Sequence, residues 1–292
     1  MPDDAQQADL DRIKSGGLPL AAVQRLSEQA DRFGTANEFF TSDLSVAELA
    51  LTHDCGYEPL GQVMGSCVYN VGWQSQNFGW SGYQSREMET LTNAYSEARR
   101  LAFDRLRQEA KLLRADGVVG VRLLRKGDTS LSGGMVEFLA LGTAVRQSLA
   151  PPKQGEPFVS NLSGQEHWAL RSAGFKPLGF VYGNCSYCQY PDRQPGSFSV
   201  LGRNIEFTAL TQGVYTARAL AANRSDAEAR HLRAHGVIGT TVEFDMEPVR
   251  PDKQPMFYLL HFCVFGTAIA PDPDVESLAF DVPFVVSLGG NA

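Results

Sequence analysis

The sequence predicts an α+β fold made of two tandem copies of one small unit, each an antiparallel sheet covered by one long helix and preceded by a short one. Two observations predict it. Residues 40–45 (FTSDLS) recur as residues 158–163 (FVSNLS), and residues 57–69 recur as residues 175–187, both 118 positions later. Each copy also shows the same succession of helix-like and strand-like periodicity.

Two further blocks extend the repeat. Residues 114–120 match residues 233–239 at an offset of 119, and residues 138–145 match residues 262–269 at an offset of 124. Four blocks in one order, separated by small loop insertions, indicate an internal duplication. The chain is therefore divided into an N-terminal segment (1–38), a first copy (39–150), a second copy (151–270) and a C-terminal tail (271–292).

The N-terminal segment contains a predicted amphipathic helix over residues 18–33. Pro19 lies near its first turn, where the ring is tolerated. The helix packs on the first copy by default, and docking to a partner is the alternative. Its apolar stripe consists of Leu20, Val23, Leu26, Ala30 and Phe33.

Each copy begins with a predicted short helix. Ser45–Glu48 and Ser163–Glu166 both fit the capping box, in which a hydroxyl and a carboxylate satisfy free N–H groups at the helix start. Gly56 and Gly174 then stand where a left-handed residue ends such a helix.

The rest of each copy is predicted to form a strand, a long helix and two closing strands. Apolar residues recur at helical spacing in the long stretches, and β-branched and aromatic residues dominate the strands. In chain order these elements are 60–69, 91–115, 118–124 and 135–145 in the first copy, and 178–187, 208–234, 237–244 and 256–269 in the second.

The last strand of the second copy carries information about packing. One helix can cover only one face of a small sheet, yet residues 257–265 are apolar at nearly every position. We therefore expect the second face of the sheet to be buried against the sister copy or another chain. So small a sheet is also marginal alone, which favours an oligomer.

Composition excludes several classes of function. The chain of 292 residues is 43% hydrophobic with a net charge of −7 and no basic stripe, which argues against nucleic acid and anionic membrane as partners. Residues 1–7 lack the apolar core of a signal peptide, and the longest apolar stretch, 256–269, is too short to span a bilayer. An odd count of five cysteines suggests a reducing compartment, so we expect a cytoplasmic protein.

The repeated blocks resemble the YbjQ-like family, which is labelled heavy-metal-binding. The resemblance covers residues 39–145 and 158–269 and implies a dodecin-like β-α-β-β unit that assembles into rings, typically pentamers, without implying a defined reaction. It is carried by residues 59–61 (PLG), 97–120 and 142–145 (GTAV) in the first copy, and by residues 177–179 (PLG), 233–239 and 266–269 (GTAI) in the second.

Two departures from the family pattern matter. The acidic position after the long helix is Asp116 in the first copy and His235 in the second. Two fused units also prevent whole chains from forming one five-membered ring with both copies equivalent. Five chains could form two stacked rings, and three chains could form a pseudo-sixfold ring.

The second copy holds a candidate site for a soft divalent metal such as zinc. Cys185 and Cys188 form a CxxC pair, and His261 and Cys263 alternate onto one face of the last strand. A structural zinc ion needs four such ligands. His231 and His235, spaced i, i+4, are a weaker candidate pair.

Other interpretations of these residues stay open. Cysteine is among the most buried residue types, so Cys185 can be an ordinary core residue, and His231 and His235 can complement the negative end of a helix dipole. Redox catalysis is disfavoured because the CxxC pair runs into a loop, whereas a reactive thiolate is usually placed at a helix N-terminus.

The loop of residues 71–83 is rich in glycine and aromatic residues and carries no lysine. Such aromatic side chains favour a protein interface or a stacked flat ligand, and a loop folded back on its own domain is the alternative. The candidate interface residues are Trp73, Phe78, Trp80 and Tyr83.

The sequence as a whole predicts a non-enzymatic, ring-forming homo-oligomer with no certain cofactor. One alternative is a metal-binding protein proper that uses Cys185 and Cys188 with His261 or Cys263. Another is an enzyme or small-ligand binder with a pocket between the copies. No catalytic triad, carboxylate pair or nucleotide-binding motif stands out in the sequence.

Overall fold

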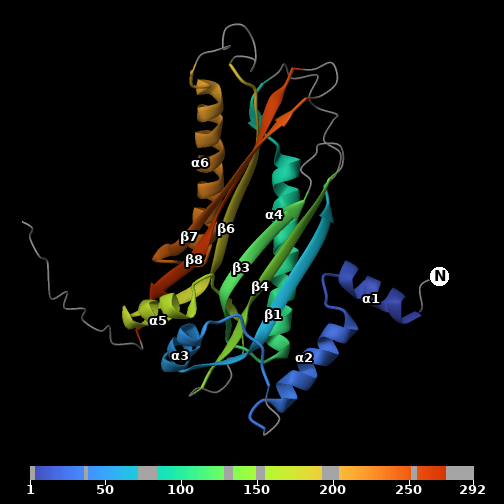
Figure 1. The fold of residues 1–292 in the computed structure, drawn as a ribbon, viewed down its shortest axis with the longest axis vertical. Coiled ribbons are helices and arrows are strands. Elements are labelled where there is room, and N and C mark those ends of the chain that lie inside the picture. The colour runs from blue at the N-terminus through green and yellow to red at the C-terminus, as the bar shows by residue number, and fades with distance from the viewer. Residues whose placement is uncertain are drawn as a thin grey trace, which may run out of the picture.

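The computed structural model describes residues 4–35, 39–71, 84–127, 134–148, 155–192, 204–250 and 255–273. Within these ranges the chain forms six helices and two four-stranded sheets, so the fold is α+β, as predicted (Figure 1). We refer below to residues 39–148 as the first half and to residues 155–273 as the second half.

The N-terminal amphipathic helix is confirmed, and a second helix precedes it. The sequence did not indicate the first of these helices because its stretch is polar and lacks an apolar stripe. In chain order the helices are α1 (Asp4–Lys14), α2 (Leu20–Arg32), α3 (Val46–Asp54), α4 (Glu89–Leu112), α5 (Gly164–Ser172) and α6 (Thr208–His231).

The strands form one sheet mainly from each half. Sheet A has the order β1-β4-β3-β5 and sheet B the order β2-β6-β8-β7. Sheet A consists of β1 (Tyr57–Asn70), β3 (Gly117–Gly127), β4 (Met135–Gln147) and β5 (Phe158–Val159), and sheet B of β2 (Arg86–Glu87), β6 (Phe175–Gln189), β7 (Gly236–Val249) and β8 (Phe257–Pro271).

The short helices α3 and α5 start and end as the sequence predicts. The Ser45 hydroxyl accepts the backbone N–H of Glu48 while the Glu48 carboxylate accepts the N–H of Ser45, and Ser163 forms the same capping box in α5. Gly56 and Gly174 follow with φ of +76° and +78°, a conformation that favours glycine.

The halves exchange short strands, which corrects the prediction of two separate antiparallel sheets. β5 of the second half pairs in parallel with β3, and β2 of the first half pairs with β6. Phe158 donates its N–H to the carbonyl of Asp116 at 3.1 Å, and Met88 donates to that of Ser186 at 2.8 Å. Two-residue strands carry no periodicity, so the sequence could not indicate them.

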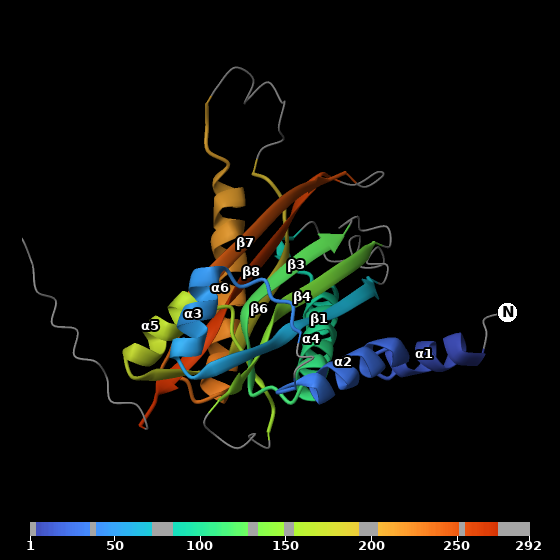
Figure 2. The same ribbon diagram turned by 60° about the horizontal axis from the view of Figure 1, so that its bottom comes forward.

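The long helices each cover their own sheet at close range. A Cβ atom added to Gly65 in β1 would lie 1.9 Å from the carbonyl oxygen of Ala102 in α4, and Gly183 in β6 has the same relation to Ala221 in α6. Glycine at both positions therefore lets helix and sheet approach. In Figures 1 and 2, α4 lies between the two sheets and α6 lies on the far side of sheet B.

The two sheets differ on the face turned away from their own helix, which we call the outer face. The outer face of sheet B is buried along β6 and β8, whereas that of sheet A presents apolar side chains to solvent, with Val68 65% and Met135 63% exposed. Met64 and Leu124 are exposed on the same face, because side chains alternate along a strand. The predicted burial of the second sheet face is therefore found in sheet B, where α4 of the first half covers that face.

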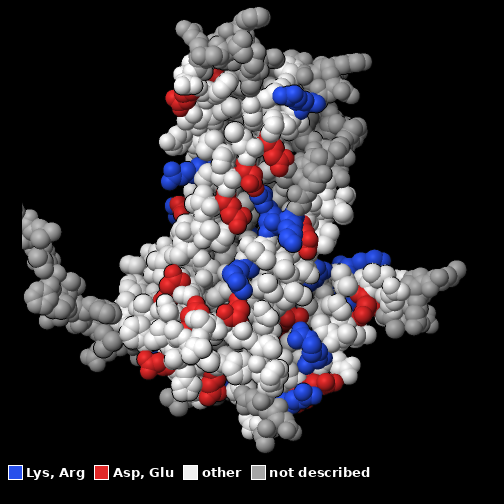
Figure 3. Space-filling view, in the orientation of Figure 1, with Lys and Arg blue, Asp and Glu red and all other residues white. Residues whose placement is uncertain are grey.

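Charged side chains of both signs are interspersed on the face shown in Figure 3, with large uncharged areas between them. Among the described residues, no helix combines the length and the apolar character needed to cross a membrane.

Replacing Gly65 with alanine tests the close packing of α4 on sheet A. We expect Gly65→Ala to lower the free energy of unfolding by about 1–3 kcal/mol, because the added methyl group overlaps backbone atoms of α4. Urea denaturation at one chain concentration measures the change. Gly155→Ala is the control, since a Cβ there meets no atom within 4 Å; equal effects of the two changes would contradict the packing described.

Candidate functional site

The contact between the two halves, which we call the junction, is formed mainly by α4 and the outer face of sheet B. The Phe103 ring of α4 lies 4.6 Å from that of Phe180 in β6, measured between centroids, and Tyr95 lies 5.0 Å from His261 in β8. Side chains of α4 and of the outer face of sheet B belong to one hydrophobic cluster. The halves therefore share a core.

Polar side chains fix the register of the junction. The Ser96 hydroxyl donates to Oδ1 of Asn184 at 2.7 Å, and Nδ2 of Asn184 donates to the carbonyl of Thr92 at 3.0 Å. The Thr92 hydroxyl accepts the N–H of Ser186 at 3.0 Å. Asn184 is buried, so these bonds satisfy groups that would otherwise be costly to remove from water.

Ion pairs also join the halves at the edge of the junction. Arg99 lies 3.1 Å from Glu228 of α6, and its guanidinium stands 4.4 Å above the Tyr182 ring. Arg224 of α6 lies 2.7 Å from Glu87 of β2. Burial disfavours ionisation of Glu87, but hydrogen bonds from Arg224 and a neighbouring threonine hold its pKa below the ordinary value.

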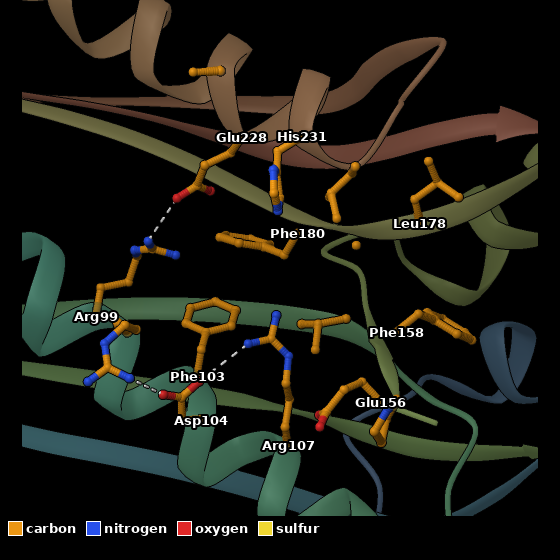
Figure 4. A pocket seen from close by; sticks show the side chains of 16 residues that line it. Arg99, Phe103, Asp104, Arg107, Glu156, Phe158, Leu178, Phe180, Glu228 and His231 are labelled. Carbon is orange, nitrogen blue, oxygen red and sulfur yellow. Dashed lines mark hydrogen bonds and ion pairs between the residues drawn. The ribbon is translucent and has the colours of Figure 1, made fainter. Parts of the chain in front are cut away.

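A pocket of about 780 Å³ opens at the junction, between α4 and the C-terminal end of α6 (Figure 4). Phe103 and Phe180 point into it from opposite halves, and the Arg99–Glu228 pair crosses one side. The pocket therefore combines an aromatic floor with a charged rim.

The remaining charged groups around the pocket are engaged with neighbours. Arg107 lies 3.6 Å from Asp104, and Glu156 pairs with Lys111. His231 enters the lining from the last turn of α6. Among the described residues, the lining holds carboxylates and one imidazole but no hydroxyl or thiol.

The CxxC pair lies in β6, and the strand separates its two thiols. Residues three apart in a strand point to opposite faces. Cys185 accordingly packs toward α6 with Ala217 and Ala221, whereas Cys188 belongs to the core shared with the first half. In this fold the two thiols do not converge on one ion.

His261 and Cys263 lie on the outer face of sheet B, as their alternation predicts. Nδ1 of His261 lies 3.0 Å from the Ser186 hydroxyl, and Sγ of Cys263 lies 3.2 Å from the Tyr182 hydroxyl. Both side chains are thus engaged within the junction. His235 and His231 both lie near the end of α6, with His235 against the Phe175 ring.

Burial raises the pKa of Cys185 to about 12 and that of Cys188 to about 12, so both thiols are protonated near neutral pH in the metal-free chain. Within the described ranges no cluster of three or more His, Cys, Asp or Glu side chains is placed to hold a metal ion. The residues present do not fit a structural zinc site.

The aromatic interface candidates Trp73, Phe78, Trp80 and Tyr83 fall outside the described residues. The sequence raised a pocket between the copies only as an alternative and named none of its lining residues, because the lining comes from segments that only the fold brings together. One signal could have singled out Glu228 of the lining. Glu109 and Glu228 occupy equivalent positions of the repeat, and each accepts a backbone N–H at 2.8 Å, Glu109 from β1 and Glu228 from β6.

The chain is similar in sequence to a protein family and to several known proteins. The model of the YbjQ_1 family, described as "Putative heavy-metal-binding", matches residues 56–148. The Encapsulin nanocompartment protein Rv1762c of Mycobacterium tuberculosis is 42% identical over 232 residues, which are 78% of this chain and 84% of that protein. A UPF0145 protein of Clostridium perfringens is 41% identical over 90 residues (30% of this chain and 81% of the relative), and one of Enterococcus faecalis is 33% identical over 96 residues (31% and 84%). No solved structure matches the chain.

His167 provides a pH test of the other end of the junction, where its ring lies 5.3 Å from Tyr57 and parallel to Phe158. Burial, aided by Arg171, lowers the pKa of His167 from 6.5 to about 4. Between these values the unfolded chain binds a proton that the folded chain does not, so folding stability falls as the pH drops from 6.5 to 4.

We expect His167→Phe, which keeps a ring in the same place, to lose less stability than the wild type between pH 7 and pH 5. The loss in free energy of unfolding should differ between wild type and variant by on the order of 1–2 kcal/mol. Guanidinium denaturation at the two pH values measures it. An unchanged pH dependence in the variant would show that His167 is not buried in its neutral form.

Proposed function

The chain belongs to the YbjQ-like family, and we propose that it is a non-enzymatic protein that assembles with further copies of itself into a closed ring. In this proposal residues 39–150 and 151–270 are tandem dodecin-like β-α-β-β units, and the ring is built from both. The repeated sequence blocks and the equal strand orders β1-β4-β3 and β6-β8-β7 support the assignment.

The observation that carries the proposal is the exposed outer face of sheet A. Its equivalent in sheet B is buried by α4, whereas Met64, Val68, Leu124 and Met135 meet solvent in the single chain. Apolar side chains gathered on one face of a sheet are typical of a protein–protein interface. A further chain is the simplest partner to cover them.

The relatives support self-assembly in a second way. The protein from Mycobacterium tuberculosis is named as an encapsulin nanocompartment protein and resembles this chain over most of both lengths. Association of many chains in or with such a compartment agrees with the proposal.

Metal binding by Cys185, Cys188, His261 and Cys263 stays a prediction of the sequence. Elemental analysis of tag-free protein checks it. The prediction requires a stoichiometric soft metal that is lost in the Cys185→Ser/Cys188→Ser variant, and the separation of the two thiols across β6 leads us to expect none.

Native mass spectrometry and light scattering of tag-free protein test self-assembly directly. We expect a discrete species whose mass is a whole multiple of the 31.9 kDa chain, stable on dilution into the low micromolar range. A strict monomer at every concentration would refute the proposal. A continuous distribution of masses would indicate unspecific association through the exposed apolar face.

A further inference from the structure

The outer edge of β3 is covered by residues 158–162 of the second half. Phe158 and Ser160 donate their N–H groups to carbonyls of β3 and the residue before it, and Gly120 donates to the carbonyl of Leu162 at 2.8 Å. The Phe158 ring lies over Gly117, where an added Cβ would come within 2.2 Å of it. Glycine at position 117 is therefore required by the segment that docks there.

β7 is the equivalent of β3 in the second half, and it stands at the end of its sheet. It has the same irregularity, with Gly239 at φ +59° where β3 has Gly120 at φ +63°. Gly236 matches Gly117, yet a Cβ added at Gly236 meets no atom within 4 Å. The repeat thus retains a glycine where nothing in the described part of the chain requires one.

Residues 39–44 are the equivalent of the docking segment in the first half. Ser42 lies 3.0 Å from Thr143, as Ser160 lies 3.0 Å from Thr267, so both segments are anchored to their own half in the same way. Among the described residues the aromatic end of the first segment covers no counterpart of Gly117, and Phe40, the equivalent of Phe158, is 36% exposed.

The two long helices also differ in how much of their surface is covered within the chain. α4 has one side on sheet A and the other on the outer face of sheet B, whereas α6 leaves its second side to solvent, with Tyr215 61% exposed. The adjoining residues of β7 are also apolar and exposed. These are Val242, Phe244 and Met246.

We propose that the junction within the chain recurs between chains: the free side of α6 and the outer edge of β7 bind the outer face of sheet A and residues 39–44 of a second copy. The inference rests on the proposed self-assembly and names the surfaces that perform it. The Phe40 ring covers Gly236 of the neighbouring chain. The added backbone hydrogen bonds run from Phe40 and Ser42 to the carbonyls of His235 and Val237, and from Gly239 and Thr240 to the carbonyls of Leu44 and Ser42.

Helix α2 distinguishes the junction between chains from the one within a chain. Arg25 lies 3.7 Å from Glu109, and Nε2 of Gln29 donates to the carbonyl of Leu60 at 2.8 Å. In the second half the equivalents of Glu109 and Leu60 are Glu228 and Leu178, which line the pocket. α2 therefore fills the space that stays open as the pocket in the other junction.

The free side of α6 carries smaller side chains than the corresponding side of α4. Where α4 carries Arg100 and Phe103 toward the pocket, α6 carries Ala219 and Ala222 at the equivalent positions. The smaller side chains leave room for α2 between the two chains.

Such a contact joins different surfaces, so it is heterologous and propagates from chain to chain until the ring closes. The two halves then alternate around one ring and are equal in number. The halves alternate in this arrangement, as in the pseudo-sixfold alternative, whereas two stacked rings would each contain one half only.

Replacing Gly236 tests the docking of residues 39–44 without touching the interior of the chain. We expect Gly236→Val to remain folded, with an unchanged circular dichroism spectrum, and to reduce the mass in native mass spectrometry to that of one chain. Gly155→Val is the matched control, because Gly155 is also free of neighbours within 4 Å. It should keep the wild-type mass.

Val68→Asp tests the opposite surface, since Val68 is exposed on the outer face of sheet A. We expect this variant to be a single folded chain as well. Each variant keeps one intact surface, the outer face of sheet A in Gly236→Val and β7 with α6 in Val68→Asp. Mixed in equal amounts, they should form a pair of one chain of each kind.

The outcomes separate the inference from the proposed function. A monomeric wild type would overturn both. A wild-type oligomer that survives Gly236→Val and Val68→Asp would overturn the inference alone, because the chains then assemble through other surfaces. Dissociation of both variants without pairing in the mixture would also overturn it, since a head-to-tail contact must restore one interface.

Discussion

The need to cover both faces of each sheet governs this structure. α4 meets that need twice, because Ala98 and Ala102 pack on sheet A while Tyr95 and Phe103 pack on sheet B. α6 has only one sheet to cover in the chain. The alternation of sheet and helix therefore ends with an exposed sheet face at one side and a half-covered helix at the other, and the proposed assembly follows from that imbalance.

Local chemistry was predictable from the sequence, and contacts between distant segments were not. The capping boxes at Ser45 and Ser163 predicted where their helices begin, because a capping box joins residues only three positions apart in the sequence. The docking of Phe158 on Gly117 depends on the placement of the two halves, which no local pattern encodes. The CxxC spacing predicted two thiols at one metal ion, but both residues lie in a strand. Side chains alternate along a strand, so Cys188 lies on the opposite face from Cys185.

Duplication explains why the chain's surfaces complement one another. Both halves keep equivalent groups that hold the long helix to its own sheet, such as Glu109 and Glu228, each of which accepts a backbone N–H from that sheet. Divergence then appears where the environments differ, with α2 beside the first half and the pocket beside the second. Cys188, His261 and Cys263 belong to this divergence, because they lie in the junction core.

Hydrogen–deuterium exchange of the assembled protein tests most directly whether the junction recurs between chains. Gly239 and Thr240 stand at the outer edge of β7. The account predicts that peptides covering this edge and residues 40–44 exchange slowly in the assembly and much faster in dissociated single chains, whereas β3 is protected in both. Equal exchange of the β7 edge in assembled and dissociated protein would contradict it.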